Sequence, residues 1–71
     1  MKEYAVIIER GPTSWGAHVP DLPVCVAIAD SREEVEASIK KAIELYLESL
    51  KEDGLPVPEP KTQAAMVRVA A

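Results

Sequence analysis

Hydrophobic and polar positions alternate along the first part of the chain, with the two-residue period that is typical of β-strands. Residues 4–8 are rich in β-branched side chains, and a turn signal at 11–14 separates them from a second alternating segment at 15–19. A proline-rich bend at 20–23 precedes a third short apolar run at 24–28. The pattern therefore predicts a three-stranded antiparallel sheet whose first two strands form a hairpin.

The spacing of apolar residues changes to the helical period after the third run. Ser31 and Glu34 fit a capping box at the start of a helix, and Gly54 followed by Leu55 fits a glycine-terminated end. We therefore predict a helix from about 32 to about 53 that packs one apolar face across the sheet. That face consists of Val35, Ile39, Ala42, Ile43, Tyr46 and Leu50.

Proline at every second position from 56 to 60 forbids helix and favours an extended linker. The segment Ala64–Val69 then has the composition of a last short strand, or of an arm that pairs with another subunit. The predicted fold class is thus α+β, with the order βββαβ: three antiparallel strands, one helix on one face and a short C-terminal strand. We predict one domain over 1–71, with a core at about 3–60 and a C-terminal arm or strand at 61–71.

The composition limits how such a small domain can be stabilised. A chain of 71 residues buries a small fraction of its surface and usually needs a disulfide, a metal or a partner subunit. Cys25 is the only cysteine and His18 the only histidine, so neither an intrachain disulfide nor a structural zinc site is supported. We therefore expect self-association, and no metal or cofactor.

No residue pattern in the chain supports catalysis, and we predict that the protein is not an enzyme. His18 has no second histidine or nucleophile beside it and is interpreted as a half-exposed strand residue. Cys25 is interpreted as a small buried hydrophobe. Two-metal nuclease chemistry needs carboxylates that converge on the ions, and the sequence does not cluster its candidates. Those candidates are Glu3, Glu9, Asp21 and Asp30.

The net charge of −4 disfavours direct binding to nucleic-acid phosphates and suits a basic partner. On the predicted helix, Glu44, Glu48 and Glu52 are four residues apart and form one acidic stripe. Such a stripe is usually a solvated face, and the alternative is a ridge that steers a basic protein to this surface. A free cysteine, with no visible export signal or membrane span, leads us to expect a cytoplasmic protein.

Four features, in this order and at these separations, carry a family resemblance. They are the strand at 4–9, the segment Trp15–Pro23 with its V-P-D-L-P run, the capped helix from Ser31, and the G-L-P-x-P-x-P tail at 54–60. Together they resemble the N-terminal domain of HicB antitoxins. The resemblance covers roughly residues 4–60 without interruption.

The resemblance implies a truncated RNase H-like fold and a partner, because HicB proteins neutralise small RNA-cleaving HicA toxins and usually form oligomers. Many members add a DNA-binding domain, but too few residues follow Pro60 for one, so we expect no direct DNA binding. The family usually has glycine where this chain has Val24 and Ala29. Since glycine often serves a backbone with positive φ, we expect altered loop geometry there.

We therefore predict an antitoxin that covers a small basic HicA-like toxin by stoichiometric binding. Two alternatives stay open: an oligomeric structural or adaptor module without a toxin, and a degenerate RNase H-like RNA-binding domain, which the scattered basic residues disfavour. Residues expected to bind the partner are Trp15, His18, Asp21, Leu22, Glu44, Glu48 and Glu52. Residues expected at a homodimer or higher homo-oligomer interface are Ile7, Leu45, Leu47, Met66 and Val67.

Overall fold

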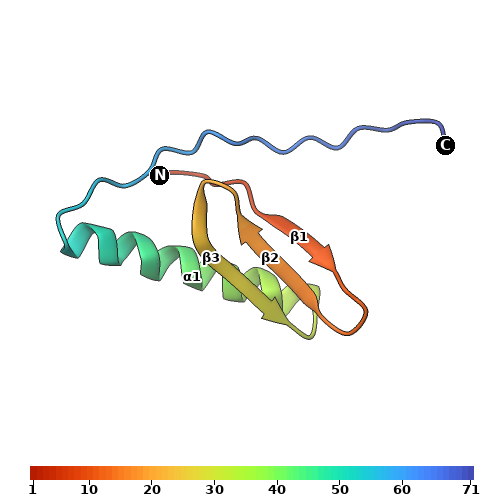
Figure 1. Cartoon of the computed structure of the whole chain (residues 1–71), viewed down its shortest axis with the longest axis horizontal. Coiled ribbons are helices and arrows are strands. Elements are labelled where there is room, and N and C mark those ends of the chain that lie inside the picture. The colour runs from red at the N-terminus through yellow and green to blue at the C-terminus, as the bar shows by residue number, and fades with distance from the viewer.

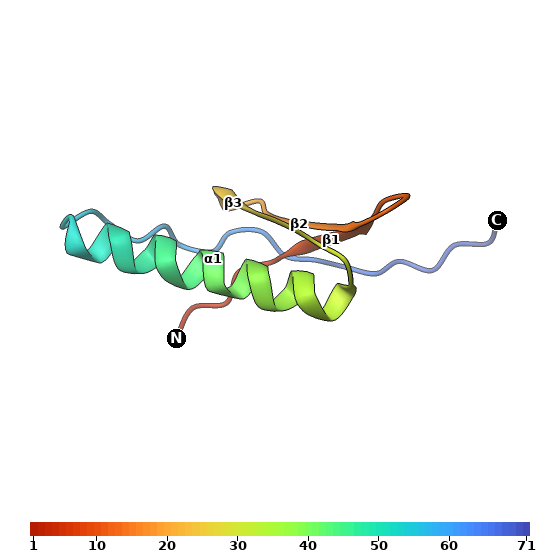
Figure 2. The same cartoon turned by 90° about the horizontal axis from the view of Figure 1, so that it is seen from below.

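One helix packs across one face of a three-stranded antiparallel sheet in the computed structural model, which describes all 71 residues (Figure 1). The elements are β1 (Ile7–Arg10), β2 (Trp15–Val19), β3 (Leu22–Ala29) and α1 (Arg32–Glu52). The strands lie in the order β1-β2-β3. Seen from the side, the sheet and α1 form two layers, and the outer face of the sheet is uncovered (Figure 2). The predicted three strands and one helix are confirmed.

The predicted first hairpin forms, but its first strand begins three residues later than predicted. β1 begins at Ile7, which lies opposite His18. A tight turn joins β1 to β2, where the backbone N–H of Gly11 donates to the carbonyl of Ser14 at 2.7 Å. Tyr4 precedes the ladder but packs against the core.

The bend before the third strand is shorter than predicted. Val19 lies opposite Leu22, so the turn consists of Pro20 and Asp21, and β3 already includes Pro23. A proline within a strand is tolerated here because β3 is an edge strand and has hydrogen-bonding partners on one side only.

Val24 and Ala29, where we expected altered loop geometry, both lie within the continuous strand β3. No residue other than Gly54 has a positive φ. The two side chains therefore impose no backbone strain, and both positions lie in a regular strand in this chain.

Both ends of α1 follow the predicted chemistry. Ser31 is the N-cap, and its Oγ accepts from the backbone N–H of Glu34 at 3.1 Å. The Glu34 carboxylate in turn accepts from the Ser31 hydroxyl at 3.2 Å, rather than from the Ser31 backbone N–H of a full capping box. At the other end, Gly54 has φ +68° and the backbone N–H of Leu55 donates to the carbonyl of Leu50 at 2.8 Å. No helix of the chain is both long and apolar enough to cross a membrane.

The core lies between the inner face of the sheet and the first half of α1. Val35 is completely buried and Ile39 is 3% exposed, whereas the second half of α1 extends past the sheet (Figure 2). Cys25 is buried in this core, and burial raises the pKa of its thiol, so its interpretation as a small hydrophobe is confirmed. The full core set is Ala17, Val19, Leu22, Cys25, Val35 and Ile39.

The predicted C-terminal strand at Ala64–Val69 is not formed. This segment is extended, but no backbone hydrogen bond joins it to the sheet. A strand needs a neighbouring ladder, and here a cavity of about 530 Å³ separates the start of the tail from β1. Beyond that point the tail runs away from the body of the molecule (Figure 1).

Replacing Ile39 with alanine tests this core. We expect Ile39→Ala to lower the free energy of unfolding by about 2–5 kcal/mol, because it removes buried methyl groups and leaves a cavity. Leu45→Ala, at a 55% exposed position on the same helix, is the matched control and should change it by less than about 0.5 kcal/mol. Urea unfolding followed by circular dichroism measures both. Equal losses for the two variants would contradict the assigned core.

Candidate protein-binding surfaces

The acidic stripe predicted on α1 is a real surface feature. Glu44, Glu48 and Glu52 are all exposed. The two ion pairs of the structure lie elsewhere, one between the N-terminal segment and the tail and one near the start of α1. The three carboxylates are therefore not neutralised by ion pairs, although lysines flank them in the sequence. Leu45, next to Glu44, exposes 55% of its surface and adds an apolar contact to this charged face.

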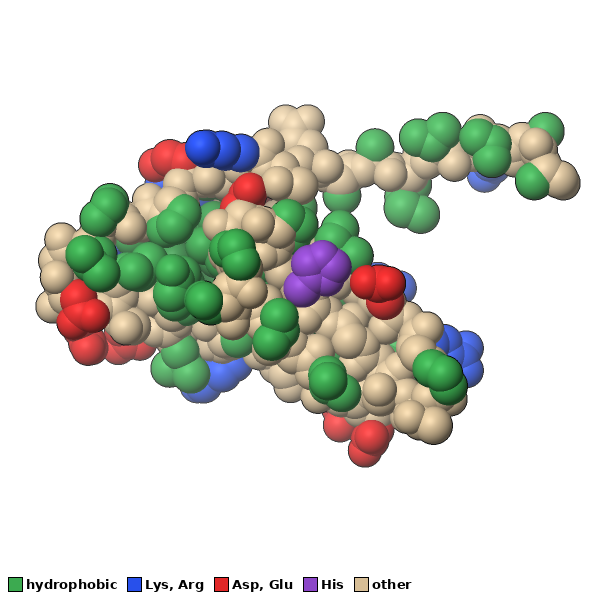
Figure 3. Space-filling model, in the orientation of Figure 1, with side chains coloured by type: hydrophobic (Ala, Val, Ile, Leu, Met, Phe, Trp, Pro, Cys, Tyr) green, Lys and Arg blue, Asp and Glu red, His purple; other side chains and the backbone are tan.

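The outer face of the sheet is apolar and uncovered. On this face His18 of β2 lies between its two cross-strand partners, Ile7 of β1 and Val26 of β3. Val24, Val26 and Ile28 are 66%, 63% and 78% exposed. Figure 3 views this face and shows the histidine among separate hydrophobic side chains, with an acidic side chain beside it. Large apolar side chains that are exposed together on one face favour a binding partner.

Sequence reasoning missed these three large residues of β3. They alternate with smaller ones, because Cys25 and Ala27 face α1 while Val26 and Ile28 face outward. Small inward residues let the helix approach the sheet closely, and the large residues are left for the outer face. The alternation of large and small side chains in the run at 24–29 was the signal that could have revealed this.

The predicted partner segment Trp15–Pro23 does not present one surface. Trp15 is half-buried against the core, with the Arg10 guanidinium 5.8 Å from its ring centroid. Leu22 is only 1% exposed and is a core residue, so its side chain is not available to a partner. His18 is exposed on the outer sheet face.

The residues predicted for self-association also lie on different parts of the molecule. Ile7 belongs to the outer sheet face, and Leu45 is exposed on α1. Leu47 lines a cavity of about 490 Å³ between the N-terminal segment and α1. Met66 and Val67 are in the projecting tail, where they are almost fully exposed. The structure thus offers several apolar surfaces rather than one.

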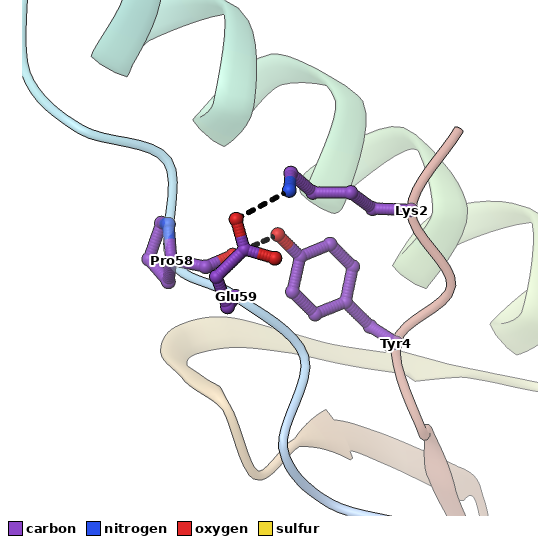
Figure 4. Close-up of polar contacts among 4 residues, drawn as sticks. All are labelled: Lys2, Tyr4, Pro58 and Glu59. Carbon is purple, nitrogen blue, oxygen red and sulfur yellow. Dashed lines mark hydrogen bonds and ion pairs between the residues drawn. The ribbon is translucent and has the colours of Figure 1, made fainter.

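The N-terminal segment holds the first part of the tail against the body (Figure 4). The ammonium group of Lys2 pairs with the carboxylate of Glu59 at 2.7 Å, which raises the pKa of Lys2. The hydroxyl of Tyr4 donates to the backbone carbonyl of Pro58. These contacts join segments at opposite ends of the sequence.

Asp21 forms a second anchor for the tail. Its carboxylate accepts from the backbone N–H groups of Lys61 and Thr62 at 2.8 and 2.9 Å, and from the Thr62 hydroxyl at 2.8 Å. These hydrogen bonds, the Thr62 backbone first, hold the pKa of Asp21 below its usual range. Asp21, predicted to contact a partner, is thus engaged with its own chain.

The carboxylates weighed for metal binding do not converge. No group of three histidine, cysteine, aspartate or glutamate side chains is close enough to hold an ion. The four candidates lie in separate segments of the chain: Glu3, Glu9, Asp21 and Asp30.

Comparison with known proteins gives a consistent picture. Residues 4–70 match the model of a family described as the HicB-like antitoxin of bacterial toxin–antitoxin systems. A UPF0150 protein of Helicobacter pylori is 45% identical over 49 residues, which are 69% of this chain and 68% of that protein. A UPF0150 protein of Archaeoglobus fulgidus is 42% identical over 55 residues, which are 73% of this chain and 80% of that protein. No solved structure matches significantly.

The Asp21 anchor should depend on pH. Because its pKa is lower in the folded protein, the anchoring is fully present above the usual aspartate pKa of about 3.9 and is lost as pH falls through the lower folded value. We expect the amide signals of Lys61 and Thr62 to shift in this acidic range in an NMR titration. Asp21→Asn should abolish the shift, and Asp53→Asn, an exposed control, should preserve it. A shift that persists in Asp21→Asn would contradict the anchor.

Proposed function

Because the chain belongs to the HicB-like antitoxin family, we propose that it neutralises a small, basic, RNA-cleaving toxin of the HicA type by binding it. In this mechanism the antitoxin covers the RNA-binding surface or the catalytic histidine of the toxin in a stoichiometric complex. This chain makes and breaks no bond. We propose the cytoplasm as its location, because cellular RNA is the target of such a toxin.

The observation that carries this proposal is the stripe of Glu44, Glu48 and Glu52. Three exposed carboxylates on a rigid helix, none of them in an ion pair, form a fixed negative surface. A protein that binds RNA needs a positive surface for the phosphates, and the same surface is complementary to this stripe. Complementary charge of this kind accelerates association and sets the orientation of the complex.

Apolar contact would supply the slow dissociation that charge alone does not give. Leu45 beside the stripe is exposed and available for this purpose. The outer sheet face, with Val26 and Ile28, is a second apolar surface on the opposite side of the sheet from α1. We propose that α1 contacts the toxin and that apolar surfaces elsewhere join copies of the antitoxin.

The uncovered outer sheet face also favours a second candidate function, an oligomeric structural or adaptor module without a toxin. Exposed Val24, Val26 and Ile28 on one face suit self-association whether or not a toxin exists. The two functions differ in one observable property, because only the antitoxin suppresses RNA cleavage by a partner.

Co-expression with a small basic toxin of the HicA type tests the proposal. We expect the two proteins to co-elute in size-exclusion chromatography, and the complex to leave a test RNA intact. Separate elution with continued RNA cleavage would reject the antitoxin function and favour the oligomeric module.

Removing the charge of the stripe tests its role in the complex. We expect the triple variant Glu44→Gln, Glu48→Gln, Glu52→Gln to weaken toxin binding about tenfold at low salt, mainly through a slower association rate. The matched control Glu3→Gln, Glu33→Gln, Asp53→Asn removes the same charge from other exposed positions and should have a much smaller effect. Surface plasmon resonance at two salt concentrations measures both. Equal effects of the two triple variants would show that net charge matters and the stripe does not.

A further inference from the structure

The last part of the chain has the character of a strand without a partner. From Gln63 onward no residue takes part in a hydrogen bond. Met66, Val67 and Val69 are 99%, 78% and 72% exposed, although β-branched and apolar residues of this kind are enriched in paired strands. The backbone donors and acceptors and the apolar side chains of this segment are therefore all available to a binding partner.

The sheet has a free edge at β1 that could pair with such an unpaired strand. β1 is hydrogen-bonded to β2 alone, so its other edge presents unpaired backbone groups. Beside that edge lies the cavity of about 530 Å³, lined by Val6, Ile8 and Trp15 on the side of β1 and by residues 63–66 of this chain's own tail on the other side. An edge strand with an apolar groove next to it is a site for the addition of another strand.

The tail does not use this edge in its own molecule. Asp21 holds it at Lys61 and Thr62, and residues 63–66 then lie across the cavity from β1 without a hydrogen bond to it. The rest of the tail leaves the body (Figures 1 and 2). The nine residues from Gln63 to Ala71 can span about 30 Å when extended, which is enough to reach a neighbouring molecule.

We propose that the tail of one copy adds as a strand to the free β1 edge of a second copy, with reciprocal exchange that produces a two-fold symmetric dimer. The occupant of the β1 groove is thus residues 64–71 of the partner. This arrangement does not depend on the existence of a toxin.

The alternation of side chains supports this occupant. In β1, Ile7 and Glu9 face outward and Ile8 faces the core. A strand that places Arg68 beside Glu9 keeps Met66 on the outer, partly apolar face and directs Val67 and Val69 inward toward Ile8 and the groove. Opposite charges and apolar side chains then meet as cross-strand neighbours.

Two single-cysteine variants test whether the contact joins different molecules. Glu9→Cys and Arg68→Cys are mixed and oxidised, and we expect a disulfide-linked dimer that contains one copy of each. The native Cys25 does not interfere, because it is 2% exposed. Glu9→Cys mixed with Ser49→Cys is the control and should give little product. If the mixture of Glu9→Cys and Arg68→Cys gives none, while the double variant forms a disulfide within one chain, the tail pairs with its own β1 and the proposal is overturned.

Charge reversal tests the register in the full chain. We expect Arg68→Glu to raise the dissociation constant of the dimer about tenfold in analytical ultracentrifugation, since it faces Glu9 twice in the symmetric pair. Adding Glu9→Arg should restore the dimer. Val67→Asp, at a position that is exposed in the monomer, should leave the circular dichroism unchanged and weaken the dimer. A wild-type protein that stays monomeric, or a dimer that none of these substitutions weakens, would overturn the proposal.

Discussion

The packing of Val35 and Ile39 against the inner face of the sheet is the contact on which the rest of this structure depends. These two helix residues are the ones that α1 buries almost completely, and they meet short side chains such as Cys25 and Ala17. The close approach excludes water from a core of six residues. In a chain this short, burial of that core is the main favourable contribution to folding, and little stability is left over.

A single helix can cover only one face of a sheet, and the binding surfaces follow from that geometric limit. The opposite face is left to solvent together with its valines and isoleucine. The second half of α1 extends past the sheet, which leaves Leu45 and the three glutamates of the stripe exposed on the helix. In a larger domain a second helix layer would bury such surfaces. Here they are available to a toxin, to another copy of the chain, or to both.

The tail has a high propensity to form a strand but is not part of the sheet. Its composition favours a strand, and the anchors at Asp21 and Tyr4 bring its start close to the sheet. Extended geometry by itself does not make a strand, because the backbone groups also need a ladder to join. The segment therefore carries the potential for pairing without the pairing itself, and that potential is directed outward from the molecule (Figure 1).

The sequence by itself determined the elements whose causes are local. The cap at Ser31, the glycine at Gly54 and the alternation in the first hairpin act over a few residues, so the helix and its end were predictable, as was the family from the order of its motifs. Only the tertiary structure decided which side chains are free. Leu22 is buried, Asp21 holds the tail and Val26 is exposed, because each outcome depends on elements distant in the sequence. A hydrophobic side chain prefers burial, but it is buried only where another layer of the structure covers it.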